Sequence, residues 1–184
     1  MIDEVPLSGG VTLRLITEQD ADALADAYVR NRDHLLPWEP RRPADFFTPQ
    51  GQADRLKDVL DQYARGQAVP WALADGDLVV GRVTLNTIVR GPFLNADLGY
   101  WVDGGYTGRG LATEAVVAVC RIADEILGLH RIAASTLLHN ESSQSVLRRT
   151  GFELVGTAPN YLEIDGRWQD CRIYQRILND RPAF

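Results

Sequence analysis

Two glycines flank an arginine where a predicted strand gives way to a predicted helix. Strand-forming residues fill Leu98–Val102, turn-prone residues follow, and a helical repeat of apolar residues begins at Leu111. Gly108 and Gly110 therefore stand at the helix entrance, where free amide N–H groups and the positive end of the helix dipole attract negative charge. Arg109 adds a cation beside them. The stretch predicts a binding site for a phosphate group.

Two common nucleotide-binding signatures do not fit this stretch. The Walker loop needs Gly-Lys-Ser/Thr after four spacer residues, and the chain has no such sequence. The dinucleotide fingerprint needs a third glycine where Thr113 stands, and an acidic residue on a later strand. From these residues alone, the alternative to a phosphate site is that Gly-Arg-Gly only makes a tight turn.

Two motifs in sequence order carry a family resemblance. Thr107-Gly-Arg-Gly-Leu-Ala112, and Asn140-Glu-Ser-Ser143 followed by Gly151-Phe152, resemble the two signatures of the GCN5-related N-acetyltransferases (GNAT), with Thr107 in place of the usual Gln or Arg. The resemblance covers roughly Val11 to Ile177 and extends to the RimJ/RimL-type subfamily, which acetylates the N-termini of ribosomal proteins. Segments similar to that subfamily are Leu35–Pro40, Asn86–Gly91, Leu98–Tyr100 and Tyr161–Trp168.

The resemblance implies acetyl-CoA as the cofactor, with its pyrophosphate on the amides of the first motif. It also implies that backbone N–H groups at the end of Leu98–Val102 stabilise the oxyanion that forms when an amine attacks the thioester. The residues expected to contact the cofactor are Tyr100, Trp101, Val102, Thr107, Gly108, Arg109, Gly110, Leu111, Ala112, Thr113, Asn140 and Ser143.

Ser143 is the candidate general acid. It matches the position where the ribosomal-protein acetyltransferases place a serine that protonates the leaving thiolate. Many relatives use a tyrosine four residues later, and that position is Leu147 here. The alternative is that Ser143 only caps the short helix that it begins, since serine is favoured there.

The general base is less clear, and three carboxylates compete for it. Asp97 matches the place where some family members put a catalytic glutamate, but it also fits an exposed strand-end carboxylate. Glu163 lies one residue from the position of another family glutamate, Leu162, and a one-residue shift along a strand turns a side chain to the opposite face. Glu39, in a proline-rich loop, is either near the acceptor or a solvated loop charge.

The acceptor pocket is expected to include Trp38, Glu39, Asn86, Tyr161 and Trp168, although each aromatic residue alone fits a core position as well. His139 stands at a strand end where it could approach the cofactor, but a single histidine without a partner is more often structural. His34 and His130 are interpreted as structural too. No His, Cys and Asp group has metal-ligand spacing, so no metal is predicted.

Length and composition indicate an ordinary globular protein. The 184 residues suit one domain over residues 1–184, with a core of about 11–177. The net charge of −6 argues against a direct nucleic-acid partner and permits a basic substrate. Cys120 and Cys171 are predicted to be buried thiols. Neither a signal peptide nor a membrane-spanning run is recognised, so a cytoplasmic location without membrane contact is expected.

The elements that position these motifs alternate in type, which predicts an α/β (α+β) fold with a mixed, mostly antiparallel sheet. The resemblance implies a GNAT fold of about seven strands and four helices, splayed in the middle. Expected strands are Val11–Leu15, Trp71–Ala74, Leu78–Val89, Asn95–Val102, Arg131–Leu137, Glu153–Ile164 and Arg167–Ile177. Expected helices are Thr17–Arg32, Gln50–Ala64, Leu111 to about Gly128, and Glu141–Arg149, with a loop over Leu35–Pro49.

Three functions follow as hypotheses. The first is an acetyl-CoA-dependent N-acetyltransferase that acts on a protein N-terminal α-amine by direct attack in a ternary complex. The second is an acetyltransferase for a small amine, such as an antibiotic or a polyamine. The third is a non-catalytic acyl-CoA-binding module. Homodimer formation is left open.

Overall fold

One mixed sheet organises the chain in the computed structural model, which describes residues 2–183. Within those residues the sheet has eight strands in the order β1-β2-β3-β4-β5-β6-β8-β7, and every neighbouring pair is antiparallel except β5 and β6. This confirms the predicted fold class. The strands are β1 (Val5–Pro6), β2 (Thr12–Leu15), β3 (Val69–Asp75), β4 (Leu78–Val89), β5 (Asn95–Val102), β6 (Arg131–Leu137), β7 (Glu153–Ile164) and β8 (Arg167–Ile177).

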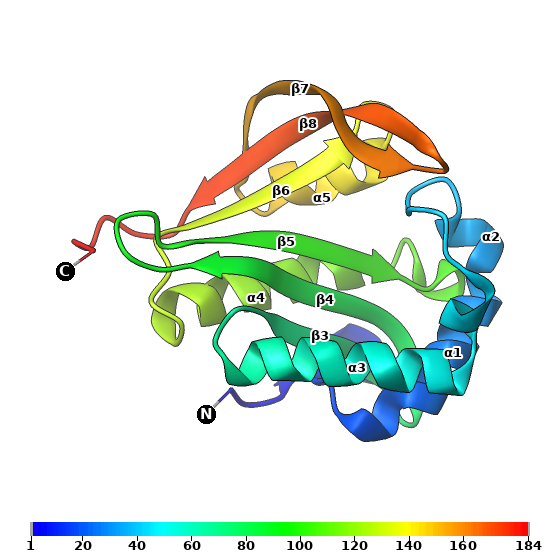
Figure 1. Ribbon diagram of the computed structural model, residues 1–184. Coiled ribbons are helices and arrows are strands. Elements are labelled where there is room, and N and C mark those ends of the chain that lie inside the picture. Colours follow the sequence, from blue (N-terminus) through cyan, green and yellow to red (C-terminus); the bar gives the residue numbers. More distant parts are fainter. Residues whose placement is uncertain (1, 184) are drawn as a thin grey trace.

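Helices cover both faces of the sheet. In Figure 1, α1 and α3 lie on one face and α4 and α5 on the other. The helices are α1 (Ala21–Arg30), α2 (Arg32–Leu35), α3 (Pro49–Ala64), α4 (Leu111–Glu125) and α5 (Glu141–Arg149). Each face has its own apolar core, because α4 buries residues such as Val116 and Val119 while α1 and α3 bury Leu24 and Leu56. The sheet is therefore held rigidly from both sides.

The two halves of the sheet part between β5 and β6, and this positions the site. These parallel strands pair only over Asn95–Asp97 and Arg131–Ala133. Beyond Asp97, β5 has no strand partner on that edge among residues 2–183, although its other edge remains paired with β4 as far as Val102. Figure 1 shows the strands diverging toward their carboxyl ends, on the side of α2. The splay that the resemblance implied is thus present.

Element bounds differ from prediction mainly near the N-terminus. The segment predicted as one helix over Thr17–Arg32 starts as a 3₁₀ turn at Glu18–Asp20, and α1 ends at Arg30 with Asn31 as its C-cap. The Asn31 amide donates to the carbonyl oxygen of Ala27 and competes with the helix hydrogen bonds there, which explains the break. Two short elements, β1 and α2, were not predicted because neither is long enough to show a period.

Candidate active site

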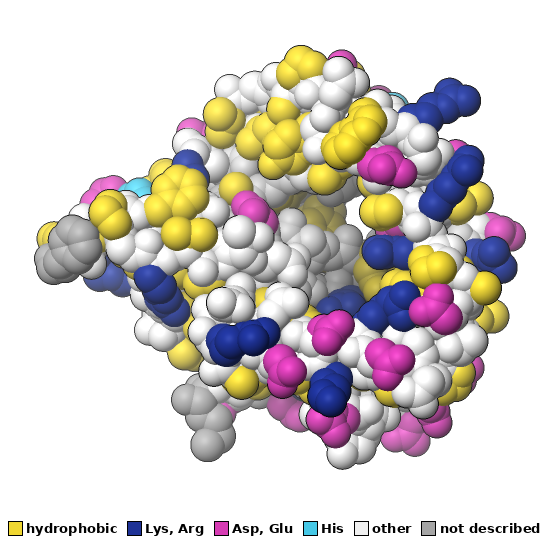
Figure 2. Space-filling model, viewed as in Figure 1, with side chains coloured by type: hydrophobic (Ala, Val, Ile, Leu, Met, Phe, Trp, Pro, Cys, Tyr) yellow, Lys and Arg dark blue, Asp and Glu magenta, His cyan; other side chains and the backbone are white. Residues whose placement is uncertain are grey.

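A cavity of about 860 Å³ fills the gap between the diverging strands. One wall is Leu98–Val102 of β5, and the opposite wall is Ala134–Leu137 of β6. The start of α4 and the start of α5 close it on one side, and the segment after α1, including His34 and Trp38, closes it on the other. Figure 2 shows the molecule hollowed at this place, between the β6–β8–β7 part and the rest.

The start of α4 presents unused amide donors to the cavity. Gly110, the N-cap residue, has a φ of 82° and no side chain caps the helix. The N–H groups of residues 110–113 donate to no acceptor within residues 2–183, as expected for the first turn of a helix. Gly108 also has a positive φ, 74°, and a Cβ there would meet no atom within 4 Å. The free amide donors, the positive end of the helix dipole and the unobstructed backbone at Gly108 together suit the binding of a pyrophosphate group.

Arg109 shapes this loop rather than lining the cavity. Its guanidinium donates to the Gly105 carbonyl oxygen and stacks on the Tyr106 ring at 4.6 Å from the centroid. Thr107 does line the cavity, and its hydroxyl donates to the carbonyl oxygen of Gly104. Arg149 of α5 is the one lysine or arginine among the described residues that line the cavity. Nothing in the sequence singles out Arg149, because arginine in the last turn of a helix is common for local reasons.

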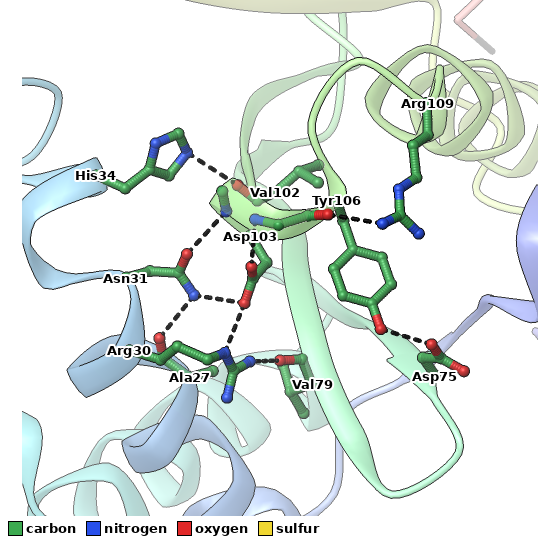
Figure 3. A network of polar contacts seen from close by, with 12 residues as sticks. Ala27, Arg30, Asn31, His34, Asp75, Val79, Val102, Asp103, Tyr106 and Arg109 are labelled. Carbon is green, nitrogen blue, oxygen red and sulfur yellow. Dashed lines mark hydrogen bonds and ion pairs between the residues drawn. The ribbon is translucent and has the colours of Figure 1, made fainter.

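Asp103 ties this loop to the end of α1 (Figure 3). Its carboxylate accepts from Arg30 Nε at 2.8 Å, from Asn31 Nδ2 at 2.7 Å and from the Gly105 amide at 2.8 Å, while Asn31 Oδ1 accepts from the Gly104 amide. Burial alone would raise the pKa of Asp103, but these hydrogen bonds outweigh burial and lower it. The carboxylate therefore stays charged and fixes the turn between β5 and α4.

His34 forms a second contact between the segment after α1 and the end of β5. Its Nε2 lies 3.2 Å from the carbonyl oxygen of Val102, the last residue of β5 (Figure 3). Because a carbonyl oxygen can only accept, Nε2 carries the proton in this contact. His34 also lines the cavity. The interpretation of His34 as purely structural missed this position at the cavity wall.

Tyr100 and Ser143 meet at the cavity from opposite sides. The Tyr100 phenol oxygen lies 2.8 Å from Ser143 Oγ, and either hydroxyl can donate. Burial raises the pKa of Tyr100 to about 12, although the hydrogen bond to Ser143 partly offsets this effect. Tyr100 therefore remains a neutral phenol at physiological pH and holds the Ser143 hydroxyl in the cavity.

Asn140, not Ser143, caps α5. The Asn140 side-chain oxygen accepts from the Ser143 amide at 3.1 Å, which is the usual N-cap geometry. The alternative interpretation of Ser143 as the cap is therefore wrong. Both residues line the cavity, and the Ser143 hydroxyl is directed to Tyr100 instead of to the helix amides.

Trp38 and Glu39 lie at the cavity as predicted. The Trp38 ring packs beside His139 at a centroid distance of 5.5 Å and against the small cluster that contains Ile164. The Glu39 side chain is only 20% exposed and accepts from Arg42 at 3.3 Å. Trp38 thus connects the proline-rich loop to the β6–β8–β7 half, and Glu39 places a carboxylate on the cavity wall.

Several other predicted residues do not line the cavity. Asp97 is exposed and is the last β5 residue paired with β6, so it stands at the apex of the splay, opposite Asn86 of β4. Tyr161 and Trp168 are 47% and 64% exposed on the β7–β8 hairpin. Of the described carboxylates considered as a base, only Glu39 lines the cavity.

The β7–β8 hairpin contributes apolar side chains instead of a carboxylate. Leu162 and Ile164 line the cavity, whereas Glu163, between them, is exposed and pairs with Trp168. Side chains alternate along a strand, so the argument that a one-residue shift turns Glu163 away from the site is confirmed.

No helix within residues 2–183 is both long and apolar enough to cross a membrane. In the same range, no three His, Cys, Asp or Glu side chains gather as metal ligands would.

Comparison with known proteins agrees with this geometry. Residues 11–153 match the family model described as acetyltransferase (GNAT) domain. The chain is 38% identical over 162 residues to the [ribosomal protein uS5]-alanine N-acetyltransferase of Escherichia coli strain K12, covering 87% of this chain and 84% of the relative. Its structure resembles that of ribosomal-protein-S5-alanine acetyltransferase from Vibrio fischeri, with a TM-score of 0.94, 34% identity and coverage of 98% and 100%. A Mycobacterium smegmatis RimJ structure in complex with CoA-disulfide has a TM-score of 0.86 at 30% identity, covering 91% and 81%.

Proposed function

The chain belongs to the GNAT family and is an acetyl-CoA-dependent N-acetyltransferase, and we propose that its acceptor is the N-terminal α-amine of a protein. The observation that carries the proposal is the cavity between β5 and β6, whose lining extends from the phosphate cradle at the start of α4 to Trp38. Two of the relatives described above are named as acetyltransferases for an alanine of a ribosomal protein, which supports a protein acceptor.

The chemistry of the amine points the same way. A free α-amine has a pKa of about 7.7–8.0, so roughly a tenth of N-termini are neutral at pH 7, whereas a lysine amine has a pKa near 10.4. The difference corresponds to about 3 kcal/mol, which a strong base would have to supply for lysine. Glu39 is the one carboxylate of the three candidates at the cavity, and it is partly neutralised by Arg42. A site with this equipment suits the α-amine.

Each step of the acetyl transfer is assigned to particular residues of this chain. Bound acetyl-CoA supplies the acetyl group as a thioester. Amides of residues 108–113 hold the pyrophosphate, and Arg149 provides a cation to a phosphate. The unpaired edge of β5 offers backbone groups to the reacting carbonyl. Ser143, held by Tyr100, gives its proton to the leaving sulfur.

Proton removal from the amine is assigned to Glu39, directly or through one water. Its carboxylate lines the cavity on the side opposite Ser143's helix and is mostly shielded from solvent. Asp97 is the second candidate, because it stands at the apex of the splay although outside the cavity lining. Trp38 would flank the acceptor, with Asn86, Tyr161 and Trp168 available to more distal parts of a protein substrate. We also propose a cytoplasmic location, since a ribosomal-protein acceptor would be met there.

Mass spectrometry tests this function directly. Cell-lysate proteins are incubated with the enzyme and isotopically labelled acetyl-CoA, and labelled sites are mapped. Label on protein N-termini is expected. Label only on small amines would replace the proposal with the small-molecule alternative, and CoA binding without thiol release for any amine would indicate the non-catalytic module. Both cysteines are buried, so they should add little to a thiol-release signal.

A further inference from the structure

A second cavity, of about 260 Å³, adjoins the active-site cavity. Leu35 and Glu39 line both, so the two spaces meet across these side chains. We call the second cavity the arginine pocket, because its walls include Arg32, Arg41 and Arg42, around a base of Tyr28, Phe46 and Phe47. An acceptor chain that leaves the active site past Glu39 would reach this pocket next.

The arginine pocket carries positive charge in a protein whose net charge is −6. Three guanidinium groups face two carboxylates, those of Glu39 and Asp165. Arg41 pairs with Asp165 at 3.0 Å, and both side chains are highly exposed. Arg42 reaches a single oxygen of Glu39 at 3.3 and 3.4 Å, which is a long contact. One cation, on Arg32, is left without a partner within residues 2–183.

Aromatic rings hold these guanidinium groups in place. Arg32 stacks on Phe47 at 4.7 Å from the ring centroid, and Arg42 stacks on Phe46 at 4.6 Å. A stacked guanidinium keeps its N–H donors in its own plane, at the ring edge, where they can meet a planar acceptor. A carboxylate is the acceptor that matches this fork and this charge.

We propose that the arginine pocket binds an acidic side chain, Asp or Glu, of the acceptor protein a few residues after its N-terminus. The proposal rests on the proposed function, because it needs an acceptor with a peptide chain. The pocket is too small for a second cofactor and is of a size for one side chain with its flanking backbone. Arg32 contributes the free cation, and Arg42 adds donors that Glu39 does not fully use.

Peptide kinetics test the subsite. A set of lysine-free peptides with a free N-terminal alanine carries a single Glu at each of the second to sixth positions, and a matched set carries Gln there. At one or two positions, kcat/KM for the Glu peptide should exceed that for the Gln peptide roughly tenfold, and the ratio should shrink at high salt. Equal rates for Glu and Gln at all positions would overturn the subsite.

Arg32 is the residue to vary, because Arg42 also touches Glu39 and Arg41 also holds Asp165. Arg32→Gln should bring the Glu-to-Gln ratio to about one, and Arg32→Glu should favour a peptide with Arg at the same position. Arg121→Gln is the matched control: it removes the same charge from α4, on the other face of the sheet, and should keep the wild-type ratio.

The outcomes separate the two proposals. Acetylation of all peptides with no dependence on the Glu position, or a ratio unchanged by Arg32→Glu, overturns the subsite and leaves N-terminal acetylation standing. If a small amine is acetylated and none of the peptides is, the proposed function fails, and the subsite falls with it.

Discussion

The phenol oxygen of Tyr100 lies 2.8 Å from Ser143 Oγ and thereby joins β5 to the first turn of α5 across the cavity. The same phenol lies 3.3 Å from the Ser143 carbonyl oxygen, to which it can only donate. When Tyr100 instead donates to Ser143 Oγ, the hydrogen of the Ser143 hydroxyl is free to be donated into the site. From the sequence, Tyr100 was expected only as a strand-end contact to the cofactor. In the structure it also orients Ser143, the proposed general acid.

Ser143→Ala should lower kcat roughly 10²-fold, the usual scale for loss of a general acid. The melting temperature should barely move, because the α5 cap belongs to Asn140. Asn140→Ala is the contrasting variant, with a loss of about 1 kcal/mol of stability. Steady-state kinetics and thermal unfolding of both proteins check this. A normal kcat in Ser143→Ala removes the serine from the mechanism.

Gly110→Asp should abolish CoA binding, because it sets a carboxylate against the phosphate cradle at the start of α4. Gly110→Asn is the matched control. Both side chains have the same shape and tolerate the left-handed backbone that Gly110 adopts, so only the charge differs. Calorimetry should find the Asn protein within a few-fold of wild type. Unchanged CoA affinity in the Asp protein would refute the cradle.

Glu39→Gln should reduce kcat/KM roughly 10²-fold while CoA affinity stays the same, since Glu39 is proposed to take the proton from the amine. Asp97→Asn, an equivalent change at the exposed apex of the splay, should stay near wild type. Measuring both variants with one acceptor decides between the two carboxylates. The reverse pattern would transfer the role of base to Asp97.

Acid should destabilise the protein partly through Asp103. Because the folded-state pKa of Asp103 is lowered, its charged form stabilises the fold above the unfolded-state pKa of about 3.9, and this contribution is lost as the pH falls toward the folded value. The pKa of Asp20 is lowered as well: burial opposes the shift, but the hydrogen bonds from Arg14 and Thr17, together with the charge of Arg14, outweigh burial. Thermal unfolding between pH 6 and pH 2.5 should therefore show a shallower decline for Asp103→Asn than for wild type. Parallel declines would contradict this assignment.

Local patterns were sufficient to predict most elements. The strands Leu78–Val89 and Asn95–Val102 and the helix Glu141–Arg149 have the predicted bounds, since turn residues delimit each of them. The helix start at Leu111 next to Gly108 and Gly110 was also predicted, because the glycines and the helical repeat are adjacent in sequence, while phosphate binding there stays a prediction. Leu162 and Glu163 lie on opposite faces of their strand, and this follows from the alternation of side chains along a strand alone.

The rest of the site depends on contacts that one sequence does not encode locally. His34 meets Val102 across 68 residues, and Arg30 meets Asp103 across 73. Tyr100 and Ser143 are 43 residues apart. Each pairing depends on how α1, α2 and α5 lie against the sheet, so neither residue type nor spacing reveals it. The two local motifs, around Gly108–Gly110 and around Asn140–Ser143, could be predicted from the sequence. The contacts that join them to the rest of the cavity wall could not.

A pair of peptides gives the most direct test of N-terminal acetylation. One has a free N-terminal alanine and no lysine, and the other has a blocked N-terminus and one lysine in an otherwise identical sequence. Rates are compared at pH 7 with saturating acetyl-CoA. Because many more α-amines than lysine amines are neutral at this pH, the free N-terminus should be acetylated much faster. If the blocked lysine peptide reacts as fast or faster, the N-terminal function is wrong.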